Sequence, residues 1–137
     1  MDRRLNRRVA IKVSHAASSD PDQLLREARS LAQLRHAGIV AVYDVAVAAP
    51  FCFVVSELLP GPSLTEWLKD RRPSPMEAVQ IVAAVADALG HAHSQSIVHR
   101  DIKPGNIVFA DGNRPVLVDF GLALSDQDSA TELGVVA

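Results

Sequence analysis

The hydrophobic pattern of the chain changes at Leu59-Pro60-Gly61-Pro62, and this change limits the folds open to the chain. Before the cluster, short β-branched runs predict strands at 8–13, 39–47 and 51–57, with one helix between the first two. After it, apolar residues recur at helical spacing. Proline and glycine together mark a joint between a β-rich first lobe and a helical second lobe. We therefore expect an α+β protein with two lobes.

Each of the three expected helices has recognisable start or stop signals. Pro21 suits the first position of the first helix, whose apolar stripe ends near Gly38. A serine followed three residues later by a glutamate opens the second helix at Ser63 and the third at Ser74. The third helix is apolar nearly all round over 78–89, which is typical of a helix buried in a core. The rest of this chain offers little to cover it, so we expect part of the helix to be uncovered.

Composition excludes several classes of protein. With 137 residues, 48% hydrophobic and 22% charged, the chain is globular and about one domain in size. A net charge of −2 gives no electrostatic case for a nucleic-acid partner. No apolar run reaches the roughly 18 residues of a membrane helix, so we expect no membrane segment in this chain. The single cysteine, Cys52, fits a reducing compartment, and we expect a cytoplasmic location.

The strongest chemical signal is the loop His99–Asn106, which reads H-R-D-I-K-P-G-N. It lies within a turn-rich stretch expected over 97–110, which precedes a hairpin-type turn at 111–113 and a short strand at 116–118. Asp119-Phe120-Gly121 stands directly behind that strand, and Val9-Ala10-Ile11-Lys12 lies on the first one. The chain has only three lysines, and two of them, Lys12 and Lys103, fall in these motifs. That placement indicates a specific need for an ammonium group.

Taken together and in this order, the motifs resemble the protein kinase family. The Lys-Pro pair after Asp101 resembles its serine/threonine branch, and the residues around the first helix are similar to bacterial members. The resemblance implies a two-lobed protein-kinase-like fold, with 1–59 as the small-lobe part and 60–137 as the large-lobe part. It also implies transfer of the ATP γ-phosphoryl group to Ser or Thr hydroxyls of protein substrates, with Mg²⁺.

The resemblance further implies roles for individual residues. Asp101 would accept the proton of the substrate hydroxyl, and Lys103 would lie near the γ-phosphate. Asn106 and Asp119 would hold Mg²⁺, and Lys12 would hold the α- and β-phosphates. The residues expected around the adenine are Ala10, Glu57, Leu59 and Val108, and those expected in an internal hydrophobic spine are Leu31, Val42, His99 and Phe120.

Glu27 is a candidate on helix geometry as well. It lies between Leu24 and Leu31, inside the apolar stripe of the first helix. An inward carboxylate needs a cationic partner, because its desolvation costs several kcal/mol otherwise. The kinase pattern supplies Lys12 as that partner. A glutamate at the edge of the stripe that reaches solvent is the alternative.

Two departures from the kinase pattern affect the expected activity. Only eight residues precede Val9 and none is glycine, so the glycine-rich phosphate loop is not present. No A-P-E motif follows the Asp119 motif. We therefore expect a fragment with both ends missing and doubtful activity on its own. The alternative is a non-catalytic nucleotide-binding or docking module, a pseudokinase by truncation. A related small-molecule phosphotransferase is disfavoured by Arg100 and by Lys103-Pro104.

Two further groups of residues can be weighed from the sequence. The histidines His91, His93 and His99 with Cys52 could suggest zinc, but their spacing matches no structural zinc site. Arg100 precedes Asp101 directly, where kinases pair an arginine with a phosphate on the activation segment. The hydroxyl candidates in that segment are Ser125, Ser129 and Thr131, of which Thr131 is preferred.

Overall fold

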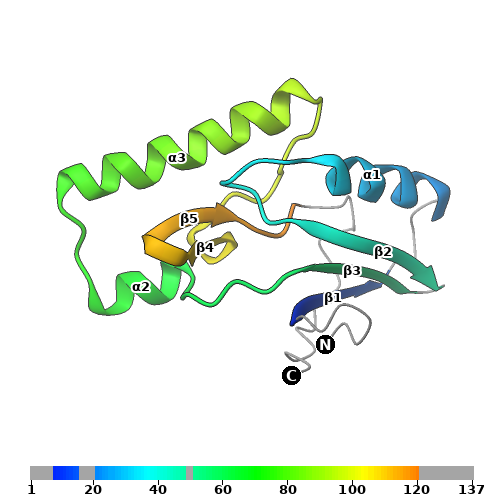
Figure 1. Cartoon of the computed structure of the whole chain (residues 1–137), viewed down its shortest axis with the longest axis horizontal. Coiled ribbons are helices and arrows are strands. Elements are labelled where there is room, and N and C mark those ends of the chain that lie inside the picture. Colours follow the sequence, from blue (N-terminus) through cyan, green and yellow to red (C-terminus); the bar gives the residue numbers. More distant parts are fainter. Residues whose placement is uncertain (1–7, 16–20, 49–50, 121–137) are drawn as a thin grey trace. The chain divides into compact units, whose positions relative to one another are not determined.

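The computed structural model describes residues 8–15, 21–48 and 51–120 (Figure 1). These residues form two compact units, each with its own packing. Described residues up to Leu34 and the segment Ala41–Leu58 belong to the first unit. The second unit contains the described residues from Leu59 onward together with the short segment Arg35–Val40.

The first unit is an antiparallel sheet with one helix. Strands β1 (Val9–His15), β2 (Val42–Ala48) and β3 (Phe51–Glu57) pair in the order β1-β3-β2, and α1 (Pro21–Gln33) packs against β2. Cys52, on the central strand, is 1% exposed. All three predicted strands and the helix start at Pro21 are therefore confirmed.

Two predicted boundaries around Gly38 are wrong. The helix ends at Gln33 rather than near Gly38, and β2 begins at Val42 rather than at Ile39. The reason lies in the backbone: Ile39 donates its N–H to the carbonyl of His36, which makes a turn, and forms a parallel bridge with Leu117 of the second unit. Residues 35–40 therefore leave the first unit before the chain returns to it.

The second unit contains two helices and a two-stranded sheet. Helices α2 (Leu64–Asp70) and α3 (Pro75–Ser94) both start with a capping box, formed by Ser63 with Glu66 and by Ser74 with Glu77. In each box the serine hydroxyl accepts from the glutamate N–H, and the glutamate carboxylate accepts from the serine N–H. The predicted starts of both helices are confirmed.

The antiparallel sheet of the second unit pairs β4 (Ile107–Ala110) with β5 (Arg114–Leu117). The prediction of turns throughout 97–110 is therefore wrong for its last four residues, which are a strand. The connection at 111–113 is the predicted turn, and its backbone needs a left-handed conformation, with φ of 70° at Gly112 and 60° at Asn113. The core beside it is formed by Val40, Ala110 and Val116.

Gly61 and Pro62 lie against the backbone of β4. A Cβ atom at position 61 would overlap the carbonyl oxygen of Phe109, so only glycine fits there. Pro62 accepts the N–H of Phe109 through its carbonyl at 3.0 Å, and Ser63 bridges Val108. The Pro-Gly cluster therefore binds the chain to β4 just before α2 begins, and it also marks the change from the β-rich to the helical sequence pattern.

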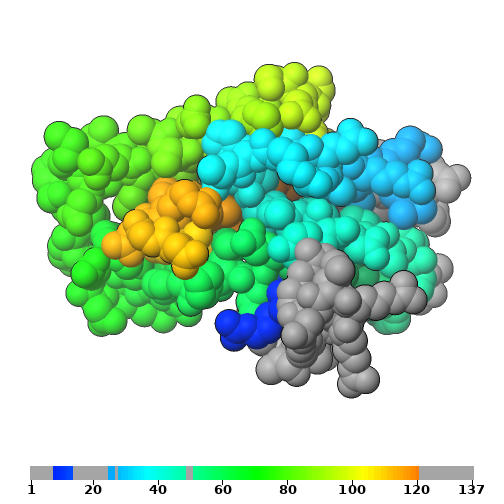
Figure 2. Space-filling view, in the orientation of Figure 1, coloured from blue at the N-terminus to red at the C-terminus, as the bar shows by residue number. Residues whose placement is uncertain are grey.

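The described part of the chain covers only one side of helix α3. Ala88 and Ala92 are fully buried, whereas Met76, Val79 and Val82 are more than 60% exposed. Figure 2 shows the first turns of this helix, in green, at the surface. The expectation that this chain offers little to cover the apolar helix is therefore confirmed among the described residues. None of the described helices is long and apolar enough to span a membrane.

Candidate active site

The loop His99–Asn106 lies in the second unit and ends in a single 3₁₀ turn, Pro104–Asn106. Proline at the first position of this turn has no N–H to satisfy. The N–H of Asn106 donates to the carbonyl of Lys103 at 2.9 Å, and the carbonyl of Asn106 accepts from Val118 at 3.0 Å. Asn106 is only 6% exposed. The loop is therefore held at its end by hydrogen bonds to its own backbone and to the residue after β5.

Asp101 receives two donors on one carboxylate oxygen. Lys103 Nζ lies 2.7 Å from Oδ2, and the amide Nδ2 of Asn106 donates to the same oxygen at 2.8 Å. Asn106 Nδ2 also donates to the backbone carbonyl of Asp101 at 2.8 Å. Among the described residues, Oδ1 is therefore the oxygen of Asp101 left to accept a further hydrogen bond.

These contacts change the acidity of Asp101. The hydrogen bond from Lys103 is the largest cause that lowers the pKa of Asp101, and the amide of Asn106 and the charge of Lys103 lower it further. Asp101 is exposed to solvent. Its carboxyl group is therefore ionised at neutral pH and accepts hydrogen bonds instead of holding a proton.

His99 connects this loop to the end of β5. Its side chain is buried, its Nε2 lies 2.8 Å from the carbonyl of Val118, and its Nδ1 accepts the N–H of Asp101 at 3.3 Å. A carbonyl only accepts and an N–H only donates, which assigns the proton to Nε2 and leaves His99 neutral. Burial lowers the pKa of His99, in agreement with that assignment.

Two residues of the motifs have strained backbones. Arg100 has φ of 68° and Asp119 has φ of 55°, both in the left-handed region that glycine favours. Such conformations persist where the surroundings fix them, and they concentrate at functional sites. Asp119 follows β5 by two residues, and the next residue, Phe120, packs its ring against His99 at 4.5 Å between centroids. The contact expected between these two rings is confirmed.

Lys12 and Ala10 lie in the first unit, two residues apart on β1. In the sheet register Lys12 is opposite Val54 and Ala10 is opposite Ser56, both on β3. Residues two apart on a strand share one face, so Lys12 and Ala10 face the same way. Glu27 lies on α1, but its side chain is outside the described part of the chain.

The remaining residues expected around an adenine are placed as follows. Glu57 ends β3, and its N–H donates to the carbonyl of Ala41 at 2.9 Å. Leu59 packs against the apolar core of the second unit. Val108 is half-buried on β4, opposite Val116. Each position is ordered, with a backbone or packing contact of its own.

The structure brings Asp101, Lys103 and Asn106 into direct contact and ties Asp119 to them through its neighbour, Val118. Sequence reasoning missed Val118, whose N–H and carbonyl both bind the loop, because backbone groups leave no signal in a motif. Ser125, Ser129 and Thr131 lie outside the described residues. Within the described ranges, no group of three or more His, Cys, Asp or Glu side chains is placed to hold a metal ion.

Comparison with known proteins gives a consistent result. Residues 1–135 match the protein kinase domain. The chain is 38% identical over 146 residues to the serine/threonine-protein kinase PknB of Mycobacterium leprae, covering 98% of this chain and 24% of that protein. It is 39% identical over 142 residues to PknL of Mycobacterium bovis, covering 99% of this chain and 36% of that protein.

A solved structure shows the same fold. The crystal structure of Rad53 1–466 in complex with AMP-PNP superimposes with a TM-score of 0.77 and 26% sequence identity, over 83% of this chain and 31% of that one. The described mixture of a β-rich sheet and a helical part is therefore part of a protein kinase fold. The chain spans between about a quarter and a third of the length of the proteins it matches.

Proposed function

We propose, from the premise that this chain belongs to the protein kinase domain family, that it serves the transfer of the γ-phosphoryl group of ATP to Ser or Thr hydroxyls of protein substrates. The observation that carries the proposal is the arrangement around Asp101, in which Lys103 and Asn106 bind one carboxylate oxygen and leave the other available. In this proposal the available oxygen accepts the hydrogen bond of the incoming hydroxyl.

The lowered pKa of Asp101 specifies what this group does. An ionised carboxylate that is a weak base orients the hydroxyl and takes its proton only late in the transfer. Phosphoryl transfer is driven mostly by positioning and by charge stabilisation, so a weak base suffices. Lys103, held 2.7 Å from Asp101, provides a positive charge beside the acceptor.

Asn106 and Asp119 have the donor atoms that Mg²⁺ prefers. The Nδ2 group of Asn106 donates both of its hydrogen bonds to Asp101, so the side-chain oxygen of Asn106 points the other way. A carboxylate and an amide oxygen suit Mg²⁺, which takes its other ligands from phosphates and water. When bound, ATP would supply the transferred phosphoryl group and Mg²⁺ would neutralise its charge. The residues present therefore fit this cofactor pair.

The remaining groups of the proposal are Lys12, Ala10, Glu27 and Glu57 of the first unit, and Leu59 and Val108 of the second. Lys12 supplies an ammonium group for the α- and β-phosphates. Ala10, on the same face of β1, provides an apolar contact for the adenine. The backbones of Glu57 and Leu59, and the side chain of Val108, complete the adenine contacts. Glu27 is proposed as the carboxylate partner of Lys12.

Serine/threonine acceptors are favoured over tyrosine by the Lys103-Pro104 pair and by the names of the relatives. Protein substrates follow from the same relatives. A cytoplasmic site of action stays part of the proposal and is supported by Cys52, a free thiol that needs no oxidising compartment.

The test compares Asp101→Asn with Asp119→Ala in the full-length protein. Because Asp101 serves the hydroxyl, Asp101→Asn should lower kcat by about 10²- to 10⁴-fold and leave the affinity for Mg²⁺-ATP within about twofold. Asp119→Ala should abolish Mg²⁺-dependent nucleotide binding. Transfer is measured on a protein substrate with phosphoamino-acid analysis, and binding by calorimetry.

Three results would contradict the proposal. Equal loss of nucleotide binding in both variants would remove the division of roles. Binding without any transfer by the wild-type protein would favour a non-catalytic nucleotide-binding module. Phosphotyrosine as the main product would exclude the serine/threonine assignment.

A further inference from the structure

The segment Arg35–Val40, which we call the strap, is bound to β5 by its backbone. Gly38 accepts the N–H of Leu117 at 2.8 Å, and Val40 donates its N–H to the carbonyl of Leu117 at 2.9 Å. The side chain of Arg114, at the start of β5, donates to the carbonyl of Ala37. Leu117 is fully buried. The strap therefore acts as a short neighbouring strand that fixes the end of β5.

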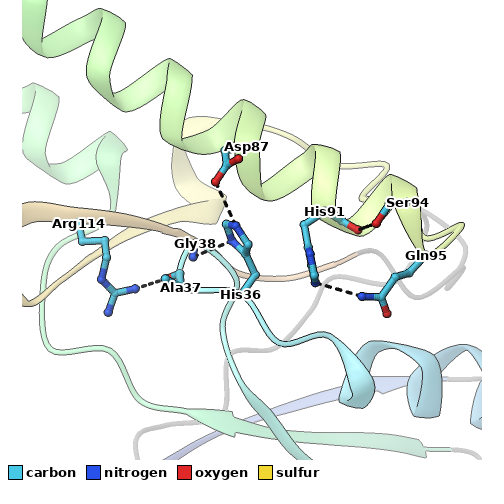
Figure 3. A network of polar contacts seen from close by, with 8 residues as sticks. All are labelled: His36, Ala37, Gly38, Asp87, His91, Ser94, Gln95 and Arg114. Carbon is cyan, nitrogen blue, oxygen red and sulfur yellow. Dashed lines mark hydrogen bonds and ion pairs between the residues drawn. The ribbon is translucent and has the colours of Figure 1, made fainter.

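The strap is shaped by the side chain of its second residue, His36. Nδ1 of His36 accepts the N–H of Gly38 at 3.0 Å, which closes a turn two residues long. Nε2 lies 3.1 Å from the carboxylate of Asp87 on α3, and the ring stacks on His91 at 5.0 Å between centroids (Figure 3). An N–H only donates, so Nδ1 is unprotonated and Nε2 donates to Asp87.

The end of β5 leads directly to Asp119. Asp119 follows Leu117 by two residues and has φ of 55°, a conformation that its surroundings must fix. Val118 is held by Asn106 and His99, as described above. The two hydrogen bonds between the strap and Leu117 restrain the residue just before Val118 in the same way.

We propose that His36 is a positioning residue for Asp119, acting through the turn bond to Gly38 and the backbone bonds of the strap to Leu117. This inference deepens the proposed function and rests on it for its effect on nucleotide binding. Asp87 and His91 orient the imidazole and are secondary, because the side chain of Asp87 is 77% exposed and such pairs contribute little alone.

Three substitutions at one position separate the turn bond from the bulk of the ring. His36→Ala removes both. His36→Asn restores the turn, because an Asn side-chain oxygen accepts the N–H two residues on. His36→Phe keeps a ring of similar size against His91 but accepts no hydrogen bond. We expect Ala and Phe to weaken Mg²⁺-ATP binding about three- to tenfold and Asn to stay within about twofold of the wild type. Gln80→Ala, exposed on α3, is the control.

The decisive measurement does not require nucleotide. Amide hydrogen exchange at Leu117 and Val40 should be about three- to tenfold faster in His36→Ala and His36→Phe, and near wild type in His36→Asn. The amide chemical shift of Asp119 should move in the same two variants. If His36→Ala does not fold, His36→Phe gives the same comparison. In kinetics, the KM for ATP should rise more than kcat falls.

The inference is overturned if His36→Phe behaves as the wild type while His36→Asn behaves as His36→Ala, because ring packing would then be the cause. Unchanged exchange at Leu117 in all three variants also overturns it. If the wild-type protein binds no Mg²⁺-ATP, the proposed function fails, whereas the exchange rates and the Asp119 shift still decide the role of His36.

Discussion

Asp101 and Lys103 form an exposed ion pair that affects the pKa of Asp101 more than the stability of the fold. Exposed ion pairs contribute little to folding, since water screens them. The same contact nevertheless lowers the pKa of Asp101, and a carboxylate that stays ionised at lower pH would keep its proposed acceptor role there. At the scale of single residues, we therefore expect this ion pair to affect how the proposed activity depends on pH.

Lys103→Ala should raise the pKa of Asp101 toward its ordinary value, because the hydrogen bond from Lys103 is the largest cause that lowers it. In the proposed function activity needs the ionised carboxylate, so the acid limb of the pH–rate profile should move to higher pH. The carboxyl titration can be followed directly by NMR. Lys69→Ala removes another exposed lysine and is the matched control. An unchanged titration of Asp101 in Lys103→Ala would contradict the prediction.

The side chains of the candidate site could be predicted from the sequence, whereas most of their restraints could not. Asp101, Asn106 and Lys103 stand in one motif, and the structure places them in contact. The groups that hold them are largely backbone atoms, such as the carbonyl of Val118, and any residue type supplies those. His36 was not identified either, since a turn bond from a histidine to the second N–H after it has no strong sequence signal.

At the scale of elements, the helix starts are where sequence and structure agree best. A capping box is a local device, and four residues contain all the atoms it needs. In the box of α3, the backbone hydrogen bond from Ser74 is the largest cause that lowers the pKa of Glu77. A lowered pKa means that this contact stabilises the fold at neutral pH.

Ser74→Ala should destabilise the protein by about 1 kcal/mol, because the first turn of α3 loses an acceptor for its N–H groups. Glu77→Gln should remove the pH-dependent part of the stabilisation that the capping box gives. That part is present above the unfolded pKa of glutamate, about 4.3, and is lost as the pH falls through the lowered value in the folded protein. Chemical denaturation at several pH values measures both effects. Gln80→Ala, inside the helix, should show neither, and equal losses in all variants would argue against a capping effect.

Elements that depend on distant partners were harder to predict. Ile107–Ala110 is four residues long and follows a loop rich in turn formers, so its pairing with β5 shows only in three dimensions. For the strap, the sequence predicts helix as far as about Gly38 and strand from Ile39, because Ile39 and Val40 are β-branched. Their partner is Leu117, nearly eighty residues away in sequence, and not the neighbouring sheet. Long helices and capped starts, which are defined locally, were identified correctly.

At the scale of the whole chain, the exposed side of α3 is the feature that matters for behaviour in solution. Met76, Val79 and Val82 recur every three residues and are more than 60% exposed among the described residues. Contiguous apolar surface of this kind promotes association, and a net charge of −2 offers little repulsion to oppose it.

We expect the 137-residue chain, produced alone, to self-associate, and Val79→Lys to reduce that association. Gln80→Lys is the matched control, because it adds the same charge to the neighbouring position without removing apolar surface. Light scattering coupled to size-exclusion chromatography, over a range of concentrations, measures the difference. Equal improvement in both variants would attribute the effect to charge and not to the apolar side of the helix.

Cys52 gives the first unit a built-in chemical reporter. It is the only cysteine of the chain, it lies on the central strand of the sheet, and burial raises the pKa of its thiol. A thiol reagent can therefore react only when a local opening of the first unit exposes this side chain. The rate of labelling therefore reports how readily this part of the first unit opens, and a substitution elsewhere that loosens the unit will be seen as faster labelling at an unchanged residue.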